Sequence, residues 1–170
     1  CHEQSFIGGD WGLNFDLADS LESSVETFRE TNRPIYLQQN PDKSKVSAGL
    51  ATGMLYTICK GIAVGDIVLC PTGDGAYHVG EVNTEYQYVP GGILPHRRSV
   101  QWYPHTLARD EMSLGLKNSA GSIGTVSNIS KHYEEIDSLL EGNSPQKLFA
   151  TDETIEDPTV FALEKHLEDF

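Results

Sequence analysis

The sequence predicts an α+β fold, a small and partly closed β-barrel flanked by helices. Two observations support this prediction. Apolar side chains recur at helical spacing through much of the first 60 residues, and after Gly65 the pattern changes to short extended runs. Three extended runs that follow one long helix favour a small curled sheet.

Composition narrows the class of protein. The chain has 170 residues and 18.7 kDa, the size of one domain with an appended segment. An apolar content of 38% in short runs excludes a membrane protein and a disordered chain, so we expect no membrane partner. The three cysteines lack CxxC spacing, which makes a reducing cytoplasm the expected compartment. No pair of histidines has ligand spacing, and we predict neither a metal nor a cofactor.

The first elements are predicted from apolar spacing. Residues 4–13 predict a short strand that enters a glycine-rich bend, with Phe6 and Ile7 in the core. Residues 21–30 repeat apolar side chains three and four apart and predict a helix, which Pro34 is expected to end.

The strongest helical pattern covers residues 44–60. Four apolar side chains form one stripe, which we expect to pack against a sheet. This stripe consists of Val46, Leu50, Met54 and Ile58. Gly61 is placed to end the helix.

Extended segments follow. Residues 66–70 and 76–88 flank a Pro/Gly-rich turn and predict a β-hairpin. Residues 98–103 alternate apolar and polar side chains and predict a third strand. Helices are expected near residues 112–117 and 131–140.

The acidity is concentrated near the end of the chain. From residue 131 onward there are 11 acidic and three basic residues, a net charge of −8; the 14 acidic and nine basic residues before it give −5. We expect one domain over residues 1–140 and an acidic linker over 141–157. Residues 158–170 predict the start of a helix that belongs to a following domain.

Several motifs occur in a fixed order along the chain. They are GDIVL (65–69), VGEV (79–82), HRRSVQW (96–102), LKNSAGS (116–122) and VSNIS (126–130). In this order and spacing they resemble the EVE branch of the PUA-like fold, as found at the N-terminus of modification-dependent restriction proteins. The likeness covers most of residues 5–140. Residues 161–170 are similar to the opening helix of the NucS-type or Mrr-type nuclease domains fused to such proteins.

The resemblance implies a DNA-binding reader. It would flip a modified base, with modified cytosine favoured, out of double-stranded DNA and hold it in an aromatic cage. The partners implied are DNA that carries a modified base and a C-terminal nuclease domain, used against foreign or phage DNA. Catalysis would belong to that nuclease domain, so no catalytic residue is predicted here.

Such a reader needs flat side chains, polar groups for the base edge and cations for the backbone. The candidate stacking residues are Trp11, Tyr86, Tyr88 and Trp102. The polar candidates are Asp10, Asn83, Thr84 and Ser119. The candidate backbone contacts are His96, Arg97, Arg98, Lys43, Lys45, Arg109, Lys117 and Lys131.

Each candidate also has a structural interpretation. Trp102 alternates with polar neighbours and is suited to a core, and Tyr86 and Tyr88 share one strand face, as in cross-strand packing. Arg97 and Arg98 point to opposite faces if extended, so one of them is expected to be structural.

Two other classes of function stay open. The net charge of −5 on residues 1–130 favours a PUA-like small-molecule or protein-interaction module that does not bind DNA. A hydrolase that uses Cys1 as an N-terminal nucleophile is the third hypothesis.

Overall fold

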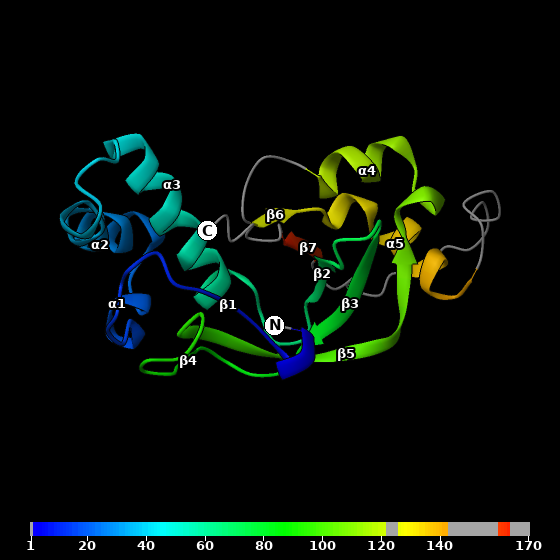
Figure 1. Cartoon of the computed structure of the whole chain (residues 1–170), viewed down its shortest axis with the longest axis horizontal. Helices are drawn as coiled ribbons and strands as arrows, with labels where there is room; N and C mark the ends of the chain where they lie inside the picture. The colour runs from blue at the N-terminus through cyan, green and yellow to red at the C-terminus, as the bar shows by residue number, and fades with distance from the viewer. Residues whose placement is uncertain (1, 122–125, 143–159, 164–170) are drawn as a thin grey trace. The chain divides into compact units, whose positions relative to one another are not determined.

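The computed structural model describes residues 2–121, 126–142 and 160–163. The chain forms two compact units. Unit 1 comprises Cys1–Val64 and Asn83–Val100, and unit 2 comprises Gly65–Val82 and Gln101–Phe170. Each unit combines helices with strands, so the predicted α+β class is confirmed (Figure 1).

Unit 1 is built from helices and three short strand segments. Its elements are η1 (His2–Gln4), β1 (Phe6–Gly9), α1 (Ala18–Leu21), α2 (Val25–Gln39), α3 (Lys45–Tyr56), the π-helix η2 (Thr57–Gly61), β4 (Gln87–Tyr88) and the start of β5 (His96–Ala108). Strand β1 pairs antiparallel with β5, which also pairs antiparallel with β4. Phe6 and Ile7 are buried, as predicted.

Helix α2 is longer than the sequence predicted. The hydroxyl of Ser24 accepts the Thr27 amide at 3.3 Å and starts the helix, which continues through Pro34. The prediction that Pro34 ends the helix is wrong. Proline removes one backbone donor, but Phe28 and Tyr36 on either side of it bury their rings in the core of unit 1, and this packing keeps the helix continuous.

Helix α3 exposes the first two residues of the predicted stripe and buries the side chains beside it, while Ile58 of the stripe is buried in η2. Val46 and Leu50 are 74% and 57% exposed, whereas Ala48, Ala51 and Leu55 are buried. These side chains pack in a cluster with α1 and α2, so the expectation that the helix packs against a sheet is wrong. The small alanine side chains let the helices approach closely. A spacing of four residues predicts a helix but does not show which of its apolar faces is buried.

Unit 2 is a curled sheet with short helices on its flank (Figure 1). Its strands lie in the order β5-β3-β2-β7-β6. The elements are β2 (Ile67–Pro71), β3 (Ala76–Val82), the rest of β5, η3 (Arg109–Glu111), α4 (Leu114–Ala120), β6 (Val126–Asn128), η4 (Ser130–His132), α5 (Tyr133–Leu140) and β7 (Val160–Leu163). Strands β2 and β3 form the predicted hairpin.

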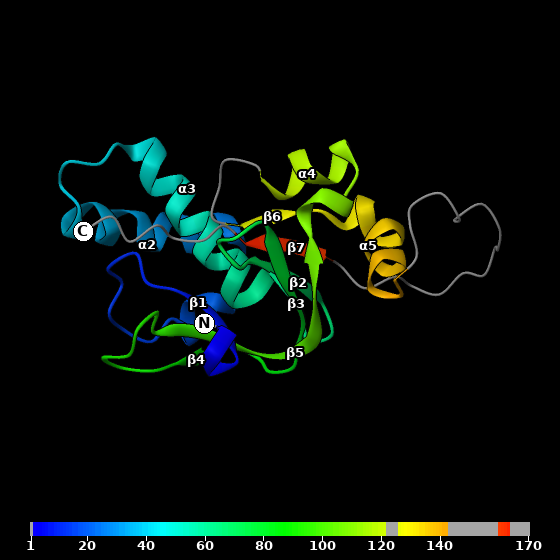
Figure 2. The same ribbon diagram turned by 45° about the vertical axis from the view of Figure 1, so that its right-hand side comes forward.

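Strand β7 replaces part of a predicted helix. Its residues lie between β2 and β6, parallel to β2 and antiparallel to β6 (Figure 2). The helix predicted over residues 158–170 is therefore wrong for Val160–Leu163. Phe161, Ala162 and Leu163 are all buried, and such a short apolar run suits a central strand as well as a helix. The remainder of this segment and residues 143–157 of the predicted linker lie outside the described residues.

Within the described part of the chain, no helix has the length and apolar character needed to cross a bilayer.

The packing of α3 predicts a contrast between two leucines. Leu55 is 0% exposed and Leu50 is 57% exposed. Leu55→Ala should lower the free energy of unfolding by about 2–5 kcal/mol because it leaves a cavity, and Leu50→Ala by less than about 0.5 kcal/mol. Chemical denaturation of the two variants measures both values. Equal losses would contradict the observed packing and favour the stripe predicted from the sequence.

Candidate functional site

His96 lies in the core of unit 1 and is completely buried. Its Nε2 lies 2.6 Å from the Leu13 carbonyl oxygen, which only accepts, so Nε2 carries a proton. Nδ1 then accepts the Tyr86 hydroxyl at 2.8 Å, and this hydroxyl in turn accepts the Leu17 amide at 3.1 Å. A neutral imidazole satisfies every group in this chain of hydrogen bonds.

The surroundings of His96 keep it neutral. Burial lowers the pKa of His96 and raises the pKa of the Tyr86 hydroxyl. The rings of Tyr86 and Tyr88 stack on the imidazole at centroid distances of 5.9 and 5.3 Å. The structure therefore brings these two tyrosines together, but around a histidine of the protein. As His96 is buried, the prediction that it contacts the DNA backbone is wrong.

Arg98 is the second polar group in this core and is also 0% exposed. Its Nε donates to the Thr84 carbonyl at 2.7 Å, and Nη1 donates to the Ile62 carbonyl at the end of η2. Glu85 is the acid beside it, at 4.0 Å. Arg98 is thus the structural arginine of the pair, and the prediction that it contacts DNA phosphates is wrong because its guanidinium is covered.

Trp11 and Asp10 build the bend after β1. Trp11 has a φ of 51°, and its ring covers Gly9 so closely that a Cβ at Gly9 would collide with it. Asp10 is exposed, and its carboxylate accepts the Gly12 amide at 3.0 Å. Asn83 is exposed in the same unit.

The other basic candidates of unit 1 are more accessible. The Arg97 guanidinium lies 4.0 Å above the Phe6 ring and donates to the Leu94 carbonyl at 2.9 Å. Lys43 is exposed and lies 3.9 Å from Asp42, while Lys45 is exposed at the start of α3.

Unit 2 contains the remaining candidates. Trp102 lies edge-on to His78, and the Ser119 hydroxyl is 2.9 Å from His132 Nε2. Arg109 donates to the Tyr77 hydroxyl at 2.8 Å and to the Lys117 carbonyl at 3.2 Å, and Lys131 is exposed.

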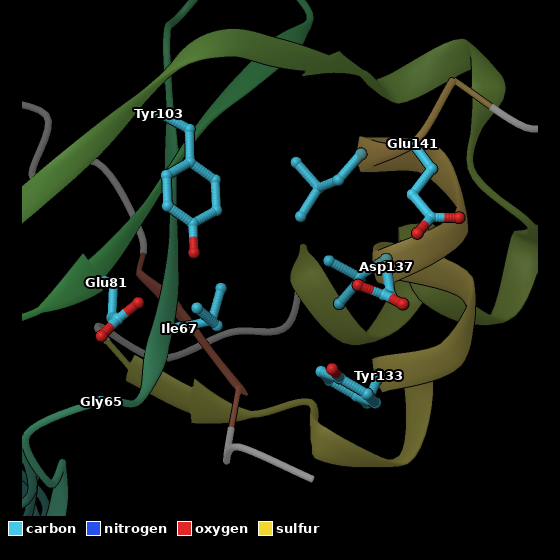
Figure 3. A pocket seen from close by; sticks show the side chains of 9 residues that line it. Gly65, Ile67, Glu81, Tyr103, Tyr133, Asp137 and Glu141 are labelled. Atoms are coloured by element: carbon cyan, nitrogen blue, oxygen red, sulfur yellow. The ribbon is translucent and has the colours of Figure 1, made fainter.

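Unit 2 also contains a cavity of about 360 Å³ that the sequence did not reveal (Figure 3). The hairpin, β5 and α5 supply its lining. The lining residues are Gly65, Ile67, Glu81, Tyr103, Tyr133, Ile136, Asp137, Leu140 and Glu141. Tyr133, Asp137 and Glu141 are four residues apart, and this helical spacing predicts that they share one face. The spacing matches no functional motif, so it did not identify the cavity.

The cavity is aromatic and acidic. Figure 3 shows the Tyr103 hydroxyl directed into it and the Asp137 carboxylate facing it from α5. Burial, followed by the negative charges of Glu81 and Asp137, raises the pKa of Tyr103. Among the described residues that line the cavity, none has a basic side chain. In the residues that the structure describes, no three His, Cys, Asp or Glu side chains form a metal-binding group.

A family comparison covers most of the chain. Residues 1–130 match the family model DUF8426, whose description is a domain of unknown function. The chain belongs to the DUF8426 family. No curated protein and no solved structure matches it. The DUF8426 match includes Tyr103 and the hairpin of the cavity, whereas α5 follows the matched residues.

The buried Cys59 of this DUF8426 member is not suited to nucleophilic chemistry. Burial raises the pKa of Cys59 to about 12, so its thiol stays protonated and is a poor nucleophile. Cys1, the proposed nucleophile of the third hypothesis, lies outside the described residues.

The pKa of His96 predicts a pH dependence of stability. The folded state resists protonation of His96, whereas an unfolded histidine takes up a proton near pH 6.5. The free energy of unfolding should therefore fall as the pH drops below about 6.5 and should reach its full value above that pH. Denaturation between pH 7.5 and 5.5, compared with His96→Gln, isolates this contribution. The same pH dependence in both proteins would contradict it.

Arg98 and Arg97 predict a second contrast. Arg98→Met leaves buried carbonyls without a donor and should lower the free energy of unfolding by about 3 kcal/mol or more. Arg97→Met removes a half-exposed cation–π contact and should cost about 1 kcal/mol. Urea denaturation of the two variants tests this order, and a reversed order would show that Arg98 is not the structural member of the pair.

Proposed function

We propose that this chain is a reader of modified DNA that accepts an extruded base in the cavity of unit 2 and directs a fused endonuclease to modified foreign DNA. The observation that carries the proposal is the cavity, where Tyr103 and Tyr133 offer flat rings beside the carboxylates of Glu81, Asp137 and Glu141. An extruded base needs flat partners to replace lost stacking and polar groups to bind its edge.

The size of the cavity suits a base. Its volume of about 360 Å³ falls in the range of about 300–1,000 Å³ typical of small-molecule sites. Ile67, Ile136 and Leu140 add an apolar wall to the two aromatic rings. An apolar wall with a few polar groups is the usual composition of a specific ligand site.

The polar groups favour a base with an exocyclic amine. Ionised carboxylates only accept hydrogen bonds, and Asp and Glu are suited to accept from the N4 amine of cytosine. Glu81 and Asp137 both influence Tyr103 electrostatically, so these three groups are close to one another. The cavity chemistry therefore favours modified cytosine over thymine derivatives, which lack that amine.

The cavity also coincides with the motifs of the EVE resemblance. Gly65 and Ile67 belong to GDIVL, Glu81 belongs to VGEV, and Tyr103 follows HRRSVQW directly. Three lining residues thus belong to motifs that carry the resemblance, and a fourth directly follows one. This coincidence supports a base-binding role for unit 2, in place of a cage made by Trp11, Tyr86, Tyr88 and Trp102.

One observation favours a second function. Three lining residues in the described part of the chain carry a carboxylate and none is basic, and tyrosine rings attract cations through their faces. An organic ammonium or guanidinium group would fit this chemistry. The corresponding function is a small-molecule or protein-interaction module that does not bind DNA.

Binding to a panel of duplexes tests the reader. The chain should bind a duplex with a modified cytosine at least about tenfold more tightly than the unmodified duplex, a difference of about 1.4 kcal/mol. Tyr103→Leu should remove this preference because it removes the flat ring, whereas Tyr103→Phe keeps the ring and should retain it. Fluorescence anisotropy measures the affinities, and thermal melting confirms that both variants are folded.

Equal affinity for every duplex in the panel would contradict the reader. Binding of a trimethylated lysine peptide or of arginine, lost in Asp137→Asn, would then establish the second function.

A further inference from the structure

Helix α2 carries two arginines one turn apart, Arg29 and Arg33, which sequence analysis did not select. Both side chains are half-buried, and their Nε atoms are covered without a hydrogen-bond partner. Residues four apart lie on the same helix face, so the two guanidiniums are neighbours.

The two arginine side chains pack over two glycines of α3. The Arg29 guanidinium lies over Gly53, where its Nη2 is 2.5 Å from the position that a Cβ would occupy. The Arg33 guanidinium lies over Gly49 in the same way, with Nη2 at 3.5 Å from the corresponding position. Helices α2 and α3 pack against each other, and both guanidiniums lie over glycine positions of α3.

Neither arginine is neutralised by an acid. Within the described part of the chain, no carboxylate lies within 4.0 Å of either guanidinium. Glu26 and Glu30 are exposed on the same helix and form no ion pair with them.

Lys45 extends this pair along α3. It is exposed and lies one turn before Gly49, on the helix face that carries the two glycines. Lys45 also has no carboxylate within ion-pair distance among the residues described. We call the set of Arg29, Arg33 and Lys45 the arginine face.

We infer that the arginine face binds phosphates of duplex DNA. The Nη groups of a guanidinium donate in a planar fork that fits phosphate oxygens, and the position of each guanidinium over glycine limits the entropy lost on binding. The net charge of the chain does not prevent this, because salt screens charges beyond about 8 Å. The inference rests on the proposed function in that it assumes DNA as the anionic partner.

Salt-dependent binding to an unmodified duplex tests the inference. Arg29→Gln and Arg33→Gln should each weaken binding and reduce the slope of log K against log salt concentration by about one. The loss should be the same factor for modified and unmodified duplexes, because a phosphate contact carries no base information. Lys60→Gln is the control for charge, since Lys60 is exposed and lies 4.0 Å from Glu22.

The outcomes separate the two proposals. Wild-type slopes in both arginine variants would overturn the arginine face, as would absence of duplex binding by the wild-type chain. If Arg29→Gln impairs folding, Arg33→Gln tests the inference alone, because the Arg33 guanidinium packs less closely on its glycine than the Arg29 guanidinium does. Binding without preference for the modified duplex would contradict the reader, while a reduced slope would still support the arginine face.

Discussion

The burial of Arg98 is the constraint on which the core of unit 1 depends. A covered guanidinium requires acceptors, and the carbonyls of Thr84 and Ile62 supply them. The end of η2 and the segment before β4 must therefore meet at β5. His96 lies two residues earlier on the same strand face and fixes Leu13 and Tyr86 in the same way. Because side chains alternate along β5, His96 and Arg98 of HRRSVQW point inward and stabilise the core.

Several elements could be predicted from the sequence because local signals and packing agree. The hairpin β2–β3 follows from two apolar runs around a glycine-rich turn, and Phe6 and Ile7 follow from their strand. The errors at Pro34, at the α3 stripe and at β7 share one cause. In each case the local sequence was compatible with two structures, and tertiary packing determined which one formed. The local pattern did not show which element would pack against the segment.

The candidate site was less predictable than the fold. The sequence predicted a cage of aromatic residues, but Tyr86 and Tyr88 stack on His96. The cavity combines Glu81 on β3, Tyr103 on β5 and Asp137 on α5, which are far apart in the sequence. Helical spacing placed the α5 side chains on one face, yet only the fold shows what that face meets.

The charges of the two units have different consequences for DNA binding. The carboxylates of Glu81, Asp137 and Glu141 repel phosphates, so in the proposed reader the cavity would contribute selectivity for a base but little affinity for a duplex. Affinity for DNA comes mainly from cations that displace counterions from phosphates. Since His96 and Arg98 are buried, the proposed reader would need cations elsewhere on the chain. The arginine face is the source that we propose, and Arg29 and Arg33 lie outside the motifs that carry the resemblance.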